Sequence, residues 1–321
     1  MSALSRIITT LFFVVTTFLF LYLYEGDILY VVQNKLSEGK THYDDTIGAV
    51  LITVVMYLIH LFTLAVTGLR SKGFGLTFFP PILLLSALLL LRPEAKVGTA
   101  YVAVTVFLTI MFFLGVWYCS QMSRIPTKDS ERFKFMKSLW GDLSIVIISM
   151  VLLWGLTDAS DVYHHRARSE RLILAGEADR VVGVGRRTKA TDKSLTSLRI
   201  YSMAVSRQLG DSLFSIPIDI GGDEVLPIGD DVRFLLLSRD SLLRTLGVDP
   251  RLGHDVASRL RYALRRDSTR MVAADLLLSS LLIDGKKDAF ASELTKYYEI
   301  NDSLPLIYKE ITNSIKQNEK D

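Results

Sequence analysis

The sequence predicts an all-α protein in which five transmembrane helices precede a helical, α-solenoid-like soluble tail. Hydrophobic residues make up 50% of the 321 residues, and the mean hydropathy is +0.31. The charges are segregated: residues 1–158 contain 12 Lys or Arg and 10 Asp or Glu, whereas the last 163 residues contain 25 and 24. This pattern excludes a single soluble domain and a disordered chain, and it divides the protein into a transmembrane domain, 1–158, and a tail, 159–321.

Composition also limits the function. The net charge of +3 is spread over both halves, without the strongly basic face that is typical of nucleic-acid binding. The only cysteine is Cys119, so neither an intrachain disulfide nor a cysteine-based metal site can form. The sequence contains no P-loop, HExxH, GxSxG or protein-kinase motif. We therefore expect no cofactor and no enzymatic activity.

Five apolar segments have or approach the ~20 residues that a helix needs to cross the hydrocarbon core of a bilayer. They are residues 7–24, 46–69, 73–91, 97–123 and 139–157. The first follows Arg6, but it is longer than the apolar region of a signal peptide and lacks a small-residue cleavage site, which favours a retained anchor. Between the first two spans, residues 25–45 contain a mostly apolar stretch that predicts a short interfacial helix ending near Gly39.

The third segment is irregular because Pro80 and Pro81 lie about a third of the way along it. Proline removes a backbone donor and clashes with the preceding turn, and in a membrane the freed carbonyl groups must find partners within the protein. The segment is either a spanning helix with a kink, a helix that starts near Pro80, or a re-entrant half-helix, since residues 82–91 alone are too short to span. The choice decides the side of the membrane on which the tail lies.

Positive charge favours five spans. With the N-terminus in the cytoplasm, five spans place eight Lys or Arg residues of the flanks and loops inside and four outside. Four spans would move the five basic residues between Arg124 and Lys137 to the outside, which is unfavourable. We therefore predict a multi-pass protein of a bacterial inner membrane, with a cytoplasmic N-terminus and a periplasmic tail.

The tail has a helical pattern interrupted by turns. Helices are expected near residues 162–175, from 179 onward, and at 193–209, 232–246, 252–266, 269–283, 287–300 and 306–315. Five Gly and Pro residues predict a loop at 211–231. Helix–Gly–helix junctions at Gly176 and Gly285, with Pro305 after the later pair, are typical of tetratricopeptide-like stacks, although the spacing is irregular. An ordinary helical bundle is the alternative.

Short motifs are spread over most of the chain: Glu25-Gly26-Asp27, Thr41-His42-Tyr43, Ile47-Gly48-Ala49, Phe78-Phe79-Pro80, Leu209-Gly210-Asp211 with Phe214, and Tyr297-Tyr298 with Leu304-Pro305 and Tyr308. Together they resemble a family of uncharacterised bacterial multi-pass integral membrane proteins with a tetratricopeptide-like helical tail. The resemblance implies a membrane location and this architecture. It assigns no activity and no catalytic residue.

Two ionisable residues fall inside the predicted spans. His60 lies mid-span, where an ionisable residue is costly and is by default a functional candidate, but a neutral histidine can equally hydrogen-bond to a neighbouring helix. Asp142 lies one turn into the fifth span, where it is either interfacial or favoured by the helix dipole. Their different depths argue against a proton relay between them. Together with Pro80 and Pro81, they form the candidate intramembrane site.

Two polar clusters follow the spans. The first shares roughly one helical face and is a weak candidate for a metal site, against the commoner solvated face: Asp158, Asp161, His164 and His165. The second predicts either a solvated face with ion pairs or a docking surface for an acidic partner or anionic lipid headgroups: Arg259, Arg261, Arg265 and Arg266.

These observations favour a membrane-anchored interaction or scaffold protein, whose bundle anchors it and whose tail binds a protein partner. The alternative is a small transporter or transporter subunit, in which a broken third helix and His60 form the substrate site. A membrane enzyme would rest only on the Asp and His cluster. The expected partners are thus the lipid bilayer and a protein, and not a nucleic acid.

Overall fold

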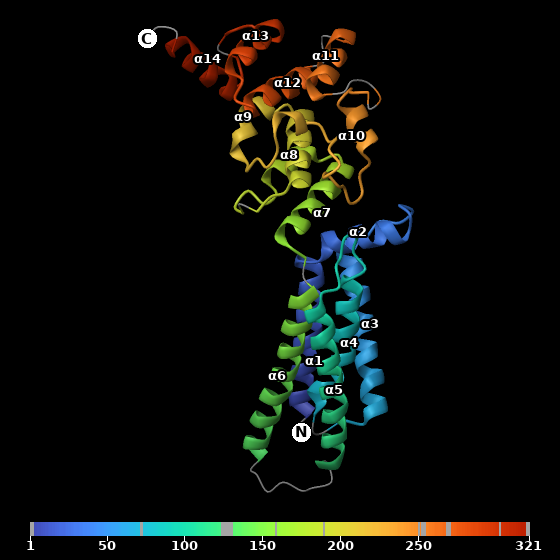
Figure 1. The fold of residues 1–321 in the computed structure, drawn as a ribbon. Helices are drawn as coiled ribbons and strands as arrows, with labels where there is room; N and C mark the ends of the chain where they lie inside the picture. The colour runs from blue at the N-terminus through green and yellow to red at the C-terminus, as the bar shows by residue number, and fades with distance from the viewer. Residues whose placement is uncertain are drawn as a thin grey trace. The chain divides into compact units, whose positions relative to one another are not determined.

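The computed structural model is all-α and describes residues 3–70, 73–122, 131–157, 159–188, 190–249, 251, 255–267, 271–301 and 303–318. These residues form helices, turns and loops and contain no β-strand, as the sequence predicts. The chain divides into two compact units, Met1–Ala159 and Ser160–Asp321 (Figure 1). Each unit has its own hydrophobic core.

The first unit is a bundle of mostly long, apolar helices. Its elements are α1 (Ala3–Leu23), α2 (Gly26–Leu36), α3 (Asp45–Thr67), the 3₁₀ helix η1 (Phe74–Phe78), α4 (Phe79–Leu89), α5 (Thr99–Met122) and α6 (Glu131–Thr157). Four of them, α1, α3, α5 and α6, are long and apolar enough to cross a membrane. They coincide with the first, second, fourth and fifth predicted spans. The chain is therefore a transmembrane protein.

The surface pattern of this unit is that of a protein in lipid. Large hydrophobic side chains such as Leu11, Phe62 and Phe113 are exposed on α1, α3 and α5. Small polar side chains, among them Ser5 and Thr9 of α1, are buried between the helices. Because lipid tails are as apolar as leucine, transmembrane helices gain little by burying apolar groups and pack instead through small and weakly polar residues.

The predicted helix between the first two spans forms as α2. The chain leaves it through a turn that contains Gly39 in the left-handed conformation, with φ of +77°. The apolar side chains of Ile28, Leu29, Val31 and Val32 are buried, and α2 packs on α1 and α3. Its apolar face is thus covered by protein.

The third apolar segment consists of two short helices in series, η1 and α4, which together cover Phe74–Leu89. Pro80 and Pro81 occupy the first turn of α4, where backbone N–H groups have no intrahelical partner and a proline costs least. Of the alternatives above, a helix that starts near Pro80 describes the segment best, with one 3₁₀ segment before it.

Contacts at its two ends define how the third segment runs through the bundle. At the start, the backbone N–H of Gly75 donates to Oδ1 of Asp142. Asp142 was expected one turn into its helix, but α6 begins at Glu131, so this buried residue lies about three turns inside the helix. Beyond its far end, Arg92 donates to the carbonyl oxygen of Thr157, the last residue of α6. The segment therefore runs parallel to the second half of α6, from Asp142 to Thr157, over about 22 Å at 1.5 Å per residue (Figure 1).

The second unit contains shorter helices. They are α7 (Asp161–Leu174), η2 (Ala178–Gly183), α8 (Lys193–Val205), α9 (Leu209–Ser212), η3 (Leu213–Ser215), η4 (Gly222–Glu224), α10 (Arg239–Thr245), α11 (Val256–Arg266), α12 (Met271–Ile283), α13 (Lys287–Tyr297) and α14 (Leu306–Asn318). Only short 3₁₀ turns, η3 and η4, occur between Leu213 and Asp231, the region in which the sequence predicts a loop.

Two predicted tail helices are wrong in extent. The helix expected from residue 179 is the 3₁₀ turn η2, which ends at Gly183 because the glycines there disfavour helix. The helix expected at 232–246 is reduced to α10, which starts after its N-cap Ser238. The reason is tertiary: the N–H groups of Leu235 and its two successors donate to the buried carboxylate of Glu170 in α7 and are not free for a helix.

Helix α12 is the centre of the second unit. Its residues Ala273 to Leu282 are all buried, and it packs against α8, α9, η4, α11 and α13. A helix that is apolar on all sides is a core helix. The consecutive helices α11, α12 and α13 do pack on one another, as in a stack, but coverage of α12 by α8, α9 and η4 is a feature of a globular bundle. The predicted tetratricopeptide-like arrangement stays a prediction.

Candidate functional site

His60 lies where α3 meets the irregular third segment. Its side chain is 1% exposed and stacks on Phe78, with ring centroids 3.9 Å apart and an interplanar angle of 6°. Nδ1 of His60 lies 3.0 Å from the hydroxyl of Thr77, which in turn donates to the carbonyl oxygen of Phe74 at 2.6 Å. The hydroxyl of Thr77 therefore links the ring of His60 to the backbone of η1.

Asp142 holds the same segment from the other side. Its Oδ1 accepts the backbone N–H of Gly75 at 2.7 Å, and its Oδ2 accepts the hydroxyl of Ser138 at 3.3 Å. A Cβ atom at Gly75 would lie 2.7 Å from the backbone oxygen of Asp142, so only glycine allows this approach of η1 to α6. Asp142 and His60 thus hold η1 through separate partners. Pro80 and Pro81 set the start of α4 next to them.

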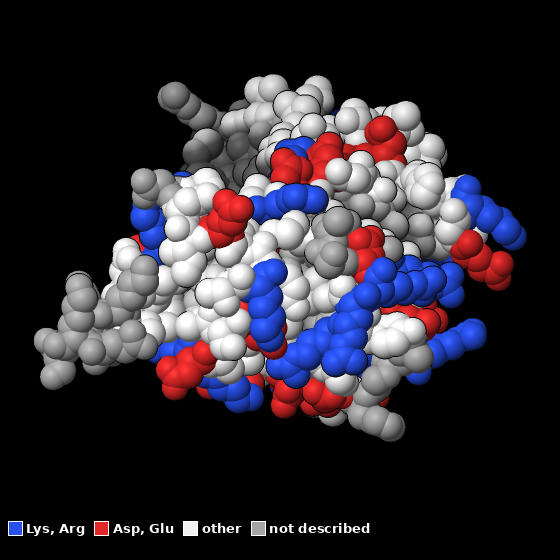
Figure 2. Space-filling view, turned by 90° about the horizontal axis from the view of Figure 1, so that it is seen from above, with Lys and Arg blue, Asp and Glu red and all other residues white. Residues whose placement is uncertain are grey.

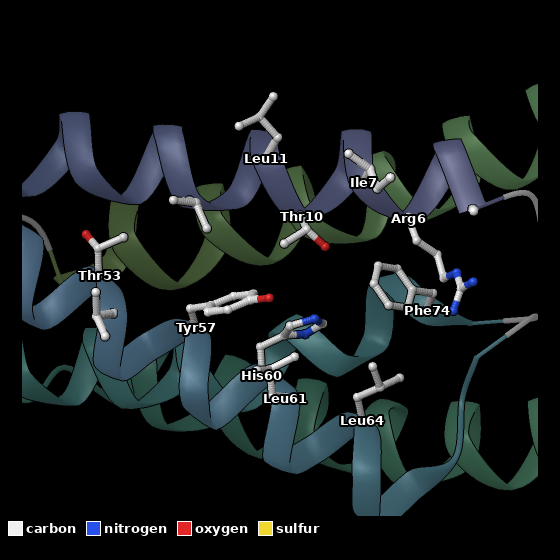
Figure 3. Close-up of a pocket in the computed structure, with 13 residues that line it drawn as sticks. Arg6, Ile7, Thr10, Leu11, Thr53, Tyr57, His60, Leu61, Leu64 and Phe74 are labelled. Atoms are coloured by element: carbon white, nitrogen blue, oxygen red, sulfur yellow. The ribbon is translucent and has the colours of Figure 1, made fainter.

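A groove beside His60 opens between α1 and α3 (Figure 3). Its volume is ≈ 690 Å³, within the ~300–1,000 Å³ of typical ligand sites. Most of its walls are apolar, and the lining residues are Ala3, Arg6, Ile7, Thr10, Leu11, Val14, Thr53, Val54, Tyr57, His60, Leu61, Leu64 and Phe74.

The polar groups of this groove come from both helices. Tyr57 and His60 point from α3 toward α1, and Arg6 lies near Phe74 at one end (Figure 3). Nε of Arg6 and the hydroxyl of Thr53 are buried and have no hydrogen-bond partner among the described residues. The groove therefore offers an apolar channel with hydrogen-bonding groups along it and a cation at one end, which suits an amphiphilic molecule.

Sequence reasoning identified His60 and not the groove. Arg6, Thr53 and Tyr57 have no common pattern in the sequence, and they meet only because α1 packs on α3. The one available signal was the 3.6-residue period that places Thr53, Tyr57 and His60 on one face of α3.

Two members of the predicted metal cluster, His165 and Asp161, have other roles in the structure. Asp158 lies outside the described residues. His165 directs its Nε2 to the hydroxyl of Thr188 at 3.1 Å, and Asp161 starts α7. Among the residues that the structure describes, no group of three or more His, Cys, Asp or Glu side chains is placed to hold a metal ion. Burial, reinforced by the Arg199 cation, lowers the pKa of His165, so its ring is neutral at pH 7.

The predicted arginine cluster lies on α11 and divides into two parts. Arg261 pairs with Glu293 of α13 at 3.3 Å, and Arg259 is half-buried. Arg265 and Arg266 are exposed in the last turn. Figure 2 shows basic side chains gathered into a contiguous group on part of the face that it presents, with acidic residues along its edge.

Buried charges in α7 are functional candidates that sequence reasoning missed. Arg166 and Glu170 occupy the buried face of this helix, at the spacing where apolar residues are usual. Arg199 of α8 is 0% exposed. The available signal in the sequence was their spacing: Arg166 and Glu170 follow Tyr163 by three and seven residues and so share its face of the helix, yet both are charged.

Comparison with known protein families, with characterised proteins and with solved structures yields no match to this chain.

Proposed function

We propose that this chain is a membrane-anchored interaction protein, in which the bundle holds the protein in the bilayer and the tail binds a protein partner through α11. The observation that carries the proposal is the outer face of α11, where Arg265 and Arg266 are exposed near Tyr262, itself 48% exposed. Arginine and tyrosine are the side chains most enriched at binding surfaces. The positive charge favours an acidic partner.

We further propose five membrane crossings in a bacterial inner membrane, with a cytoplasmic N-terminus and a periplasmic tail. The passage of η1 and α4 along α6 supports the fifth crossing. Their combined length is about 26 Å, close to the ~30 Å hydrocarbon core. The excess of basic residues on the N-terminal side of the bundle supports the orientation.

For the tail we propose a stack built on α11, α12 and α13. The support is that these consecutive helices pack on one another and that Gly285, with φ of +70°, forms the tight turn between the last two. This arrangement agrees with the tetratricopeptide-like pattern and with the family resemblance drawn from the motifs.

Site-specific photo-crosslinking in the native membrane tests the interaction proposal. A photoreactive phenylalanine analogue at Tyr262 of the full chain should yield a discrete crosslinked species. The double variant Arg265→Glu/Arg266→Glu should abolish it, because the reversed charge repels an acidic partner.

The matched control is Arg186→Glu/Arg187→Glu, a second pair of adjacent exposed arginines in the tail. It should leave the crosslink intact. An absence of any crosslinked species at Tyr262, or equal loss with both double variants, would contradict the proposal.

The groove favours a second candidate function, a small transporter or a transporter subunit. The change from 3₁₀ to α-helix at Phe78 and Phe79 lies against His60, which lines the groove. Broken helices beside a buried polar group are typical of transporter substrate sites. The apolar walls select an amphiphilic substrate.

Uptake of a fluorescent long-chain fatty acid into proteoliposomes tests this second function. His60→Leu should abolish protein-dependent uptake at a normal protein level, whereas His42→Leu, in the loop before α3, should not. Unchanged uptake with His60→Leu would remove the support for transport.

A further inference from the structure

A second cavity lies entirely within the tail, between α7 and the turn that follows η2. Its volume is ≈ 330 Å³. One wall is the face of α7 that carries His165, Arg168 and Leu172, and the other is formed by Arg180 and residues 183–185. The cavity shares His165 with the predicted metal cluster, and none of its lining residues belongs to the docking face of α11.

The turn closes on this cavity only because residue 185 is glycine. Gly185 has φ of +64°, in the left-handed region. A Cβ atom there would lie 2.5 Å from Cδ2 of His165 and 3.0 Å from Nη2 of Arg199. The imidazole ring of His165 and the guanidinium group of Arg199 therefore both lie directly against the backbone of the turn.

Arg199 is the unusual group at this wall. Its side chain is fully buried, and Nη2 donates to the carbonyl oxygen of Val184 at 2.9 Å. Nε and Nη1 have no hydrogen-bond partner in the described part of the chain. A buried guanidinium with unused donors is costly unless an anion lies nearby.

The carboxylates near the cavity have other partners, although the charge of Asp192 also acts on the buried guanidinium group of Arg199. Glu177 pairs with Arg180 on the surface, and Asp192 caps α8 and lies 3.7 Å from Arg166. Asp161 lies one turn before His165 in α7 and is exposed. Arg168 is also exposed and makes no ion pair or hydrogen bond with the described residues.

We propose that this cavity binds a phosphate group, held by Arg168 and Arg180 at its mouth with Arg199 behind the wall of the turn. Guanidinium groups match the geometry of phosphate oxygens, and several converging cations favour a doubly charged group over a carboxylate. The ring of His165 is held in place because the hydroxyl of Thr188 donates to the carbonyl oxygen of Gly185 at 2.9 Å and accepts from Nε2.

The phosphate has two conceivable sources, a soluble phosphorylated compound and a phospholipid headgroup. The recognition chemistry is the same for both. In the sequence, His165 follows the end of α6 by only eight residues, so both sources are tested below.

Calorimetric titration of inorganic phosphate into the full-length protein, held in phosphatidylcholine nanodiscs, tests the proposal. We expect saturable binding that Arg168→Gln weakens about tenfold, as expected for one charge-assisted hydrogen bond. Arg180→Gln is the second variant, and both side chains are exposed, so both variants should fold. The control Arg244→Gln, an exposed arginine of α10, should bind as the native chain does.

The lack of saturable phosphate binding by the native chain would overturn the proposal, as would equal weakening by Arg168→Gln and Arg244→Gln. Repeating the titration in nanodiscs that contain phosphatidic acid separates the sources. Loss of phosphate binding there identifies a lipid headgroup as the occupant, because it competes for the cavity. Unchanged binding identifies a soluble phosphate compound.

Discussion

Charged side chains buried in α7 organise the first part of the tail. The carboxylate of Glu170 accepts three consecutive backbone N–H groups, those of Leu235, Leu236 and Leu237, at 2.8, 2.6 and 3.0 Å. Arg166, one turn earlier, donates to the carbonyl oxygen of Arg233 at 2.6 Å. Two side chains of one helix therefore satisfy a non-helical segment that would otherwise leave its peptide groups without partners.

Removing the carboxylate of Glu170 should release this segment. Glu170→Ala leaves the N–H groups of buried Leu235 and of half-buried Leu236 and Leu237 without an acceptor, and Arg166 without its nearby charge. We expect a cost of about 3–5 kcal/mol in the free energy of unfolding of the tail. Glu170→Gln keeps one acceptor oxygen and should cost less. Hydrogen exchange of amides 232–237 in the full chain measures the effect, with exposed Glu299→Ala as the control. Native protection in Glu170→Ala would show that the carboxylate does not hold the segment.

His165 should make the tail sensitive to acid. Burial and the Arg199 cation hold the pKa of His165 below its ordinary value of 6.5. Below pH 6.5 the unfolded chain therefore binds a proton that the folded chain does not, and stability falls as the pH falls. Phosphate-free thermal unfolding at pH 7.5 and pH 5.5 should show a drop in midpoint that His165→Gln reduces and His42→Gln does not. A drop of equal size in His165→Gln would refute this assignment.

Among the elements, η1 depends most on its neighbours. It has five residues and begins after Gly73, which has φ of +76°. Its position is set by two contacts from opposite sides, Thr77 with His60 and Gly75 with Asp142. Both intramembrane ionisable groups are thus used to hold a short helix that could not be stable alone.

The reactivity of Cys119, the single cysteine, can be used to measure how firmly η1 is held in place. A Cβ atom at Gly73 would lie 2.6 Å from Sγ of Cys119, so the start of η1 lies over the thiol. Asp142→Ala should loosen η1 and speed the reaction of Cys119 with a membrane-permeant maleimide. Ser86→Ala is the matched control, because it removes a hydrogen bond to Tyr101 toward the other end of α4. Equal labelling rates in Asp142→Ala and the native chain would mean that Asp142 does not hold η1.

How well an element could be predicted depends on whether its cause is local. The four long helices α1, α3, α5 and α6 follow from apolar runs near the length of a bilayer crossing, and α2 from a short apolar stretch ended by glycine. The start of α10 could not be predicted. The N–H groups of the residues expected to begin it are bound by the carboxylate of Glu170, which is about 65 positions away in the sequence. The groove likewise depends on the packing of α1 on α3, which the sequence does not encode in any local pattern.

In the membrane bundle, the packing of α1 against α6 fixes the direction in which each helix runs relative to the other. Near their C-terminal ends, α1 and α6 meet where Phe20 stacks on Trp154, with ring centroids 4.3 Å apart. Near the N-terminal end of α1, Arg6 lines the groove beside Phe74, and the adjacent Gly75 donates to Asp142, which precedes Trp154 by twelve residues in α6. These two helices therefore run parallel. A chain that enters with α1 and leaves with α6 ends on the opposite side of the bundle from its N-terminus.

The location of the two termini tests this account most directly. Paired reporters, one active only in the cytoplasm and one only outside the membrane, are fused in turn to the N-terminus and to the C-terminus of the full chain. We expect the N-terminal fusions to be active only inside and the C-terminal fusions only outside. Activity of both termini on the same side would contradict it, because η1 and α4 would then turn back within the membrane and not cross it.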